Sequence, residues 1–153
     1  MSEFGKGPGP ERTSPQEMLT DEMRKRAQFI LENLGFKSFV ELKDKSIADI
    51  GCGRAEFGNL ASANGSRVTS IDAKDQSANV ITTENHQFIQ AFANKIPLEN
   101  NSQDFIVSHA GPLSLGGKEA PNSVPVVVEE AKNSIREYLR ILKPTGKIRI
   151  DAS

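Results

Sequence analysis

The stretch SIADIGCGRAEFG, residues 46–58, decides the fold. Its first five residues are short and apolar enough for a buried strand, and Gly51 and Gly53 follow at once. A helical pattern continues to position 63 and ends at Asn64 and Gly65. Two glycines one residue apart let the backbone turn tightly and approach a bound molecule, and a helix start presents free N–H groups. The sequence therefore predicts a strand, a ligand-binding turn and a helix.

The rest of the chain repeats this alternation of strands and helices. Further short apolar strands are expected at 67–71, 88–91, 104–108 and 147–151. A weak helix is expected within 73–83, and a long helix over 126–142, with Val127, Ala131, Ile135, Leu139 and Leu142 facing inward. This order is typical of an α/β fold with a Rossmann-like, open, parallel sheet and helices on both faces, for which we expect the strand order 3-2-1-4-5.

The N-terminal part precedes the alternation. Residues 1–13 contain the run GKGPGP, which predicts a flexible tail, and we assign residues 14–153 to one domain. Ser14, Pro15 and Glu17 form a capping-box pattern that begins a helix. One continuous helix is expected from there to Gly35, with an apolar stripe of Leu19, Met23, Ala27, Ile30, Leu31 and Leu34.

The composition excludes several classes of protein. The 153 residues leave room for one domain, and a net charge of -1 gives no overall field that would favour nucleic acid or an anionic membrane. No apolar run approaches the roughly 20 residues that cross a bilayer. The single cysteine cannot form an intrachain disulfide, so we expect a cytoplasmic protein, with the nucleus left open. No Cys/His cluster in the sequence offers a metal site.

Carboxylates around the glycine turn indicate which ligand it binds. Asp72 ends the second strand, 19 residues after Gly53, where a carboxylate accepts hydrogen bonds from ribose hydroxyls. The sixth position of the turn is Glu56 rather than the glycine of a dinucleotide site, and its charge would repel a pyrophosphate. Asp49, just before the turn, suits a cationic amino group. These residues favour a nucleoside cofactor without phosphates over NAD or FAD.

With these residues the sequence resembles the class I S-adenosylmethionine-dependent methyltransferases, of the type 11-like kind. ADIGCGRAEFG is similar to the first motif of the family and Asp72 to the acidic residue of the second. The segments AFANKIPLENNSQD (91–104) and LRILKPTGKIRI (139–150) are similar to those before the fourth strand and around the fifth. The resemblance covers residues 46–151 and implies S-adenosylmethionine as cofactor. It places Asp49, Gly51, Cys52 and Gly53 around the methionine part, Asp72 at the ribose, the backbone around Phe92 and Ala93 at the adenine, and Ser108 near the sulfonium, with Ala73 as a further cofactor-binding residue.

Three features depart from the family pattern. Ala55 stands where the family usually has a third glycine, a change that a helix start tolerates. Phe92 stands where many members carry an Asp that binds the adenine amino group, so stacking or backbone contacts must replace that bond. The family sheet usually has seven strands, so we expect a chain truncated after the fifth. Strand 147–151 would then be an open edge that pairs with a second copy or another partner.

The catalytic residue stays unknown at this stage. His109 follows the fourth strand at the level of the ligand and is a weak candidate for a general base. Cys52 is a less favoured nucleophile, because a small residue between glycines more often has a structural role. His86 is expected at the surface. The Gly- and Pro-rich stretch 109–125 is expected to lie over the crevice and shape the acceptor pocket.

Two functions are compatible with this pattern. The first is methyl transfer to an unidentified acceptor, which could be a small molecule, a protein or an RNA, by an in-line displacement that depends mainly on positioning. The alternative is a methyltransferase-like binding or regulatory module without catalysis, which Phe92 and the short sheet favour. An NAD-dependent enzyme ranks below both because of Glu56. No transmembrane segment is expected.

Overall fold

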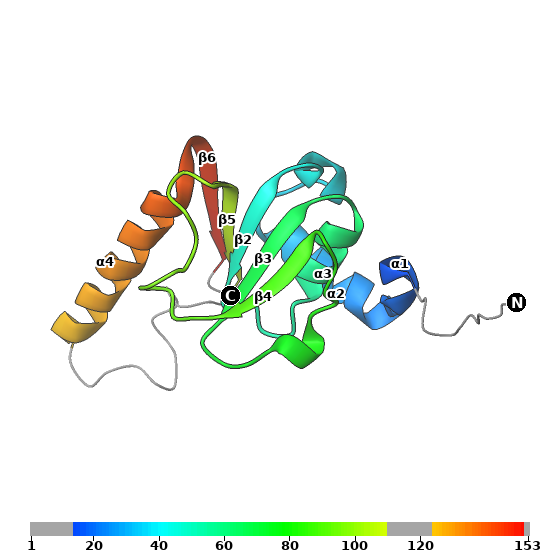
Figure 1. The fold of residues 1–153 in the computed structure, drawn as a ribbon, viewed down its shortest axis with the longest axis horizontal. Helices are drawn as coiled ribbons and strands as arrows, with labels where there is room; N and C mark the ends of the chain where they lie inside the picture. Colours follow the sequence, from blue (N-terminus) through cyan, green and yellow to red (C-terminus); the bar gives the residue numbers. More distant parts are fainter. Residues whose placement is uncertain (1–13, 110–123, 152–153) are drawn as a thin grey trace, which may run out of the picture.

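The computed structural model is built on one five-stranded parallel sheet (Figure 1). It describes residues 14–109 and 124–151, with side chains from 128 onward in the second range. The strands are β2 (Ser46–Ile50), β3 (Arg67–Asp72), β4 (His86–Gln90), β5 (Gln103–His109) and β6 (Leu142–Asp151). Their spatial order is β4-β3-β2-β5-β6, which confirms the predicted order 3-2-1-4-5 and the Rossmann-like sheet. The predicted tail, 1–13, and residues 110–123, most of the stretch that was expected to lie over the crevice, are outside the described residues.

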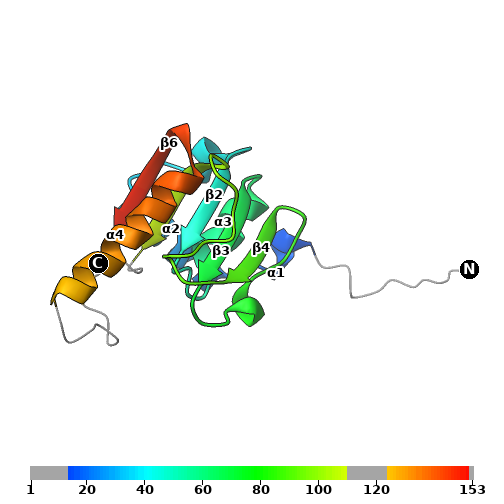
Figure 2. The same cartoon turned by 60° about the vertical axis from the view of Figure 1, so that its left-hand side comes forward.

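Helices cover both faces of the sheet, as predicted (Figure 2). The helices are α1 (Pro15–Met18), α2 (Asp21–Asn33), α3 (Glu56–Ala63) and α4 (Val124–Ile141), with 3-10 turns η2 (Phe39–Leu42) and η3 (Ser77–Asn79). Helices α2 and α3 lie on one face and α4 on the other. The short η3 takes the place of the weak helix expected within 73–83.

The N-terminal helix is interrupted, against the prediction of one continuous helix. The capping box is present, with Glu17 N–H donating to Ser14 Oγ (3.2 Å). However, α1 ends at Met18, and Thr20 caps a new helix by accepting from Met23 N–H (3.1 Å). The apolar stripe concealed this break, because Leu19 is buried even though it lies between the helices.

Successive residues of the strands feed two cores, because side chains alternate between the faces of a sheet. Ile47 packs with Leu31 and Phe57 beneath α2 and α3, whereas Ala48 packs with Ile106 and Tyr138 beneath α4. Arg149 on β6 ties the first face to the edge of the sheet. It donates to the carbonyl oxygens at the end of α2, Leu34 (3.2 Å) and Gly35 (3.3 Å), and lies 4.9 Å from the centroid of the Phe36 ring.

Helix α4 turns a different side to the sheet from the one predicted. Ser134, Tyr138 and Ile141 are buried, whereas Ile135 and Leu139 are 42% and 59% exposed. Of the other residues predicted to face inward, Ala131 is partly exposed, Leu142 begins β6 and contacts the core, and the Val127 side chain lies outside the described part.

Two polar residues of α4 account for its rotation. Arg140 donates to the carbonyl oxygens of Ile96 (2.7 Å) and Leu98 (2.8 Å), and Ile96 N–H donates to Glu137 Oε1 (2.7 Å). Because hydrogen bonds to charged groups are worth about 1.5–3 kcal/mol each, this anchor prevails over the apolar stripe.

His86 is buried, so the prediction that it lies at the surface is wrong. It begins β4, and its Nε2 lies 2.8 Å from Ser70 Oγ on the neighbouring strand. Burial lowers the pKa of His86 to about 4, so the ring is neutral. Gly58 of α3 lies directly above this pair: a Cβ added at Gly58 would be 2.6 Å from Ser70 Oγ and 2.9 Å from His86 Nε2. The helix can therefore approach the sheet closely only with glycine at this position.

Candidate cofactor and acceptor site

A cavity of about 360 Å³ lies at the carboxyl ends of β2 and β5. This volume is within the range of pockets that bind small molecules, and the carboxyl ends of the strands are where open α/β sheets bind their ligands. The residues that line it come from β2, the glycine turn, α2, α3 and the end of β5: Arg26, Ile30, Asp49, Gly51, Cys52, Gly53, Arg54, Glu56, Phe57 and His109.

The glycine turn has the conformation that its sequence predicts. Gly51 and Gly53 have φ of 71° and 53°, in the left-handed region that glycine adopts without steric cost. The N–H groups of Gly51 and Cys52 both donate to Ile71 O (2.8 and 2.9 Å), which fixes the turn to β3. Ala55 is also left-handed, with φ 60°, and is fully buried. Ala55, where the resemblance leads us to expect a third glycine, therefore keeps the left-handed backbone conformation that glycine favours.

Asp72 closes the other side of the turn. Its carboxylate accepts from Gly53 N–H (2.9 Å) through Oδ2 and from Lys74 N–H (2.9 Å) through Oδ1. Because a carboxylate has about four acceptor positions, both oxygens can still accept from a ligand hydroxyl. The end of β3 and the glycine turn are thus joined by the residue predicted to bind the ribose.

Asp49 gives the cavity its electrostatic character. Its side chain comes from β2 beneath the turn, and the residue is 5% exposed. Burial, followed by the negative charges of Asp72 and Glu56, raises the pKa of Asp49 to about 7. Asp49 and Glu56 line the cavity together with Arg26 and Arg54, and the Asp72 carboxylate lies on the other side of the glycine turn. The space next to Asp49 therefore favours a cationic group of a ligand.

The Cys52 thiol is unsuited to nucleophilic chemistry. Burial raises its pKa well above the usual range, and the charges of Asp49 and Asp72 add to the effect. The thiol contacts the carbonyl oxygen of Gly53 (Sγ–O 3.6 Å). Cys52 therefore contributes its small size and its backbone to the turn.

The remaining predicted cofactor residues do not line this cavity. Ala73 is exposed, and its carbonyl accepts from Gln90 Nε2 (3.0 Å). Phe92 is 68% exposed, and Ala93 is buried in the core beneath α4. Ser108 is fully buried and donates through Oγ to Ile50 O (3.0 Å), so its hydroxyl links β5 to β2.

Two residues that the sequence reasoning missed meet His109 at the edge of the cavity. His109 Nδ1 lies 2.8 Å from Asp151 Oδ2, and Arg26 Nη2 lies 3.4 Å from His109 Nε2. Parallel pairing places His109 and Asp151, the last residues of β5 and β6, side by side. The one signal in the sequence was that both residues end neighbouring strands. For Arg26, on an exposed part of α2, there was none.

Comparison with known proteins identifies the family. A family model described as "Methyltransferase domain" matches residues 48–150. The chain belongs to this methyltransferase-domain family. S-adenosylmethionine is the cofactor that membership implies. No curated protein matches this chain in sequence.

Solved structures share the fold at low sequence identity. A putative methyltransferase from an antibiotic biosynthesis pathway of Anabaena variabilis is 17% identical (TM-score 0.59; 83% of this chain, 44% of the other). The 1,6-didemethyltoxoflavin-N1-methyltransferase of Burkholderia thailandensis, solved with S-adenosylhomocysteine, is also 17% identical (TM-score 0.58; 85% and 51%). The [4+2]-cyclase SpnF is 21% identical (TM-score 0.60; 82% and 43%). The chain spans about half the length of these proteins.

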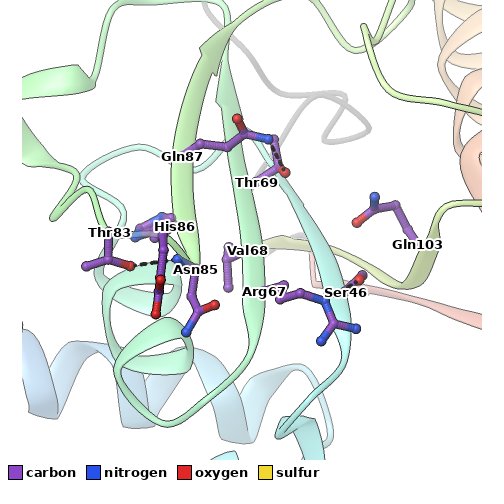
Figure 3. Close-up of a pocket in the computed structure, with 10 residues that line it drawn as sticks. Ser46, Arg67, Val68, Thr69, Thr83, Asn85, His86, Gln87 and Gln103 are labelled. Atoms are coloured by element: carbon purple, nitrogen blue, oxygen red, sulfur yellow. Dashed lines mark hydrogen bonds between the residues drawn. The ribbon is translucent and has the colours of Figure 1, made fainter.

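A second cavity, of about 330 Å³, lies at the amino ends of the strands. Figure 3 shows Thr69 and Gln87 side by side, with Gln87 Nε2 donating to Thr69 Oγ1 (3.2 Å), while Gln103 stands apart from both. Gln103 is 6% exposed, and its Oε1 is buried without a hydrogen-bond partner. Among the described residues, no group of three His, Cys, Asp or Glu could hold a metal ion, and no helix is long and apolar enough to span a membrane.

Proposed function

We propose that this chain binds S-adenosylmethionine in the carboxyl-end cavity and transfers its methyl group to an acceptor. The observation that carries the proposal is the buried carboxyl group of Asp49, directly beneath a glycine turn that Asp72 holds in place. The raised pKa of Asp49 shows that its ionised form is unfavourable at this position without a cation. A ligand with a positive charge would stabilise that form.

The residues present fit this cofactor. Its methionine part has an ammonium group and a sulfonium, and Asp49 and Glu56 in the lining of the cavity supply complementary charges. We propose that Gly51, Cys52 and Gly53 bind the methionine part through their backbone and that Asp72 accepts from the ribose hydroxyls. When bound, S-adenosylmethionine supplies an electrophilic methyl group.

The adenine side of the proposal depends on position in the fold. Ala73 directly follows β3, and Phe92 and Ala93 follow β4 after one residue, so all three belong to the carboxyl edge beside the turn. The exposed ring of Phe92 is free to stack on a base. We propose that Ser108 borders the sulfonium through its place near the end of β5, with its hydroxyl left in the bond to Ile50.

Calorimetric titration of the full chain with S-adenosylmethionine and S-adenosylhomocysteine tests this function. Asp49→Asn is expected to weaken binding about 10- to 100-fold, because a hydrogen bond between charged groups is worth about 1.5–3 kcal/mol. Thr69→Val, in the amino-end cavity, is the matched control and is expected to leave the affinity unchanged. Absence of heat with both ligands would refute the proposal.

A non-catalytic binding module is the second candidate. Phe92, 68% exposed where many relatives have an acid, is the observation that favours it. It predicts that the cofactor binds while no labelled methyl group is transferred. Methyl transfer that Asp49→Asn abolishes would exclude it.

We also propose that β6 pairs with a second copy of the chain. We propose a cytoplasmic location, because the chain has a single cysteine. In the described sheet β6 pairs only with β5, so its other side is an edge, and Ile150 of β6 is 43% exposed. Sedimentation at increasing concentration is expected to show a dimer that Ile150→Lys weakens. A single monomeric species at high concentration would contradict this.

A further inference from the structure

His109 and Asp151 form a dyad at the rim of the cofactor cavity. The parallel register of β5 and β6 aligns these residues, and His109 Nδ1 lies 2.8 Å from Asp151 Oδ2. Both side chains are largely buried, with 10% and 16% of their surface exposed. The carboxylate therefore holds the imidazole in one orientation, with the other ring nitrogen directed towards α2.

The partners of the ring assign its tautomer. Arg26 Nη2 lies 3.4 Å from Nε2, and a guanidinium can only donate, so Nε2 must be the acceptor. An ionised carboxylate can only accept, so the proton belongs on Nδ1, facing Asp151. The Phe29 ring supports this arrangement, because it lies edge-on to His109 (centroids 6.1 Å apart) and its centroid is 5.1 Å from the Arg26 guanidinium carbon.

We propose that the acceptor carries a hydroxyl group and that His109 Nε2 removes its proton during methyl transfer, with Asp151 as the positioning residue. This inference rests on the proposed function. His109 lines the same cavity as Asp49 and the glycine turn, so a base and the proposed methyl donor would share one space. The hydroxyl would replace Arg26 as the partner of Nε2, because both groups need the same lone pair.

The chemistry distinguishes a hydroxyl from an amine. As the oxygen forms its bond to the methyl carbon, the carbon–sulfur bond breaks and its electron pair stays on sulfur, which leaves as S-adenosylhomocysteine. The hydroxyl proton passes to Nε2, and the resulting imidazolium is stabilised by Asp151 until it releases the proton to water. A neutral amine attacks with its own lone pair and needs no base for that step. A dyad held in this tautomer is therefore better suited to an oxygen acceptor.

The tautomer can be read without any reaction. The chain has two histidines, so ¹⁵N-histidine labelling gives two ring systems, and His86 serves as internal reference. We expect the neutral ring of His109 to carry its proton on Nδ1. Asp151→Asn is expected to move the proton to Nε2, because an amide can donate to Nδ1, whereas the exposed Asp75→Asn control leaves it in place. A proton on Nε2 in the unaltered chain would overturn the assignment.

Methyl transfer tests the acceptor class. Tritium from labelled S-adenosylmethionine is followed into phenol and aniline, and into benzyl alcohol and benzylamine. We expect label in the hydroxyl member of at least one pair, and a loss of at least about 100-fold in kcat in His109→Asn, whose amide can still donate to Asp151. Asp151→Asn is expected to lower kcat with KM unchanged.

The outcomes separate the two proposals. S-adenosylhomocysteine binding is measured in His109→Asn and in the unaltered chain. If it binds neither, the proposed function fails. If it binds while label enters only the amines, or enters a hydroxyl compound at an unchanged rate in His109→Asn, the function stands and the dyad proposal is overturned. If it binds while label enters none of the four compounds, the dyad proposal is overturned and the non-catalytic module is favoured.

Discussion

The two cavities at opposite ends of the sheet are nearly equal in volume, about 360 Å³ at the carboxyl ends and about 330 Å³ at the amino ends, and differ in what lines them. The first has a left-handed glycine turn and the buried acid Asp49. The second is lined by polar strand residues such as Thr69 and Gln103 and by the charged Arg67 and Glu84, with neither a glycine turn nor a buried acid among its lining residues. Volume therefore says little about ligand binding. The left-handed glycine turn and the buried acid Asp49 are better indicators of a ligand-binding site.

The largest expected effect comes from the acid of the carboxyl-end cavity. Asp49 keeps its proton up to about pH 7 in the folded chain, whereas the unfolded chain releases it near 3.8. Its contribution to stability is therefore complete below about pH 4 and is lost as the pH rises to about 7. Without ligand, Asp49→Asn is expected to be more stable than the unaltered chain at pH 8, by up to about 4 kcal/mol.

Urea unfolding at pH 4, 6 and 8 measures this difference, which is expected to shrink towards zero at pH 4. Glu84→Gln, beside the amino-end cavity, is the control and is expected to show no comparable trend. A difference that does not change with pH would mean that Asp49 is not held in the state described.

The second effect concerns the backbone of the glycine turn. At Gly53, with φ 53°, a Cβ would have nothing within 4 Å, so Gly53→Ala introduces conformational cost without a clash. The left-handed conformation costs about 1–2 kcal/mol, and the less flexible unfolded chain returns about 0.4–1 kcal/mol. We expect a net loss of about 1 kcal/mol in the free energy of unfolding, measured with urea. An increase would show that the turn relaxes.

A third test addresses the amino-end cavity. Gln103→Leu removes the buried Oε1 that has no partner, together with one hydrogen bond to Ser102 Oγ (3.0 Å). Because an unsatisfied buried group costs about 1–3 kcal/mol and the lost bond about 0.5–1.5 kcal/mol, the variant is expected to gain up to about 1 kcal/mol. Thermal unfolding measures this gain. A marked loss of stability or of S-adenosylhomocysteine affinity would show that this cavity also has a role.

The smallest effect is expected at Ala55. Ala55→Gly removes about 1–2 kcal/mol of left-handed cost, but it also removes a buried methyl group worth about 0.8 kcal/mol and makes the unfolded chain more flexible. These contributions nearly cancel, so we expect a change within about 0.5 kcal/mol by urea unfolding. A larger gain would mean that alanine strains the turn.

Apart from the strand order, which follows from the fold class, the features that the sequence could predict are local ones. The strand from Ser46 to Ile50 and its glycine turn are specified by a short apolar run and two glycines, and both are observed. Asp72 could be located because it ends the next strand along the chain. For such segments the neighbours in sequence determine the conformation.

The features that the sequence could not predict depend on distant partners. The rotation of α4 is set by Arg140 and Glu137, which bind backbone more than 40 residues away, so its apolar stripe was misleading. His86 can be buried because its Nε2 forms a hydrogen bond with Ser70 Oγ on another strand. Asp151 meets His109 only through strand register. Pattern alone does not contain these contacts.

Arg149, which joins the end of α2 to β6, closes a ring of contacts around the dyad. From α2 the ring runs through Arg149 to β6, through Asp151 to His109, and through Arg26 back to α2. The ring includes the outermost strand, β6. A second copy that pairs with β6 would therefore shift the same contacts of Asp151 and His109 that an entering substrate changes. Substrate binding at His109 and pairing along β6 would then be coupled through the position of this strand.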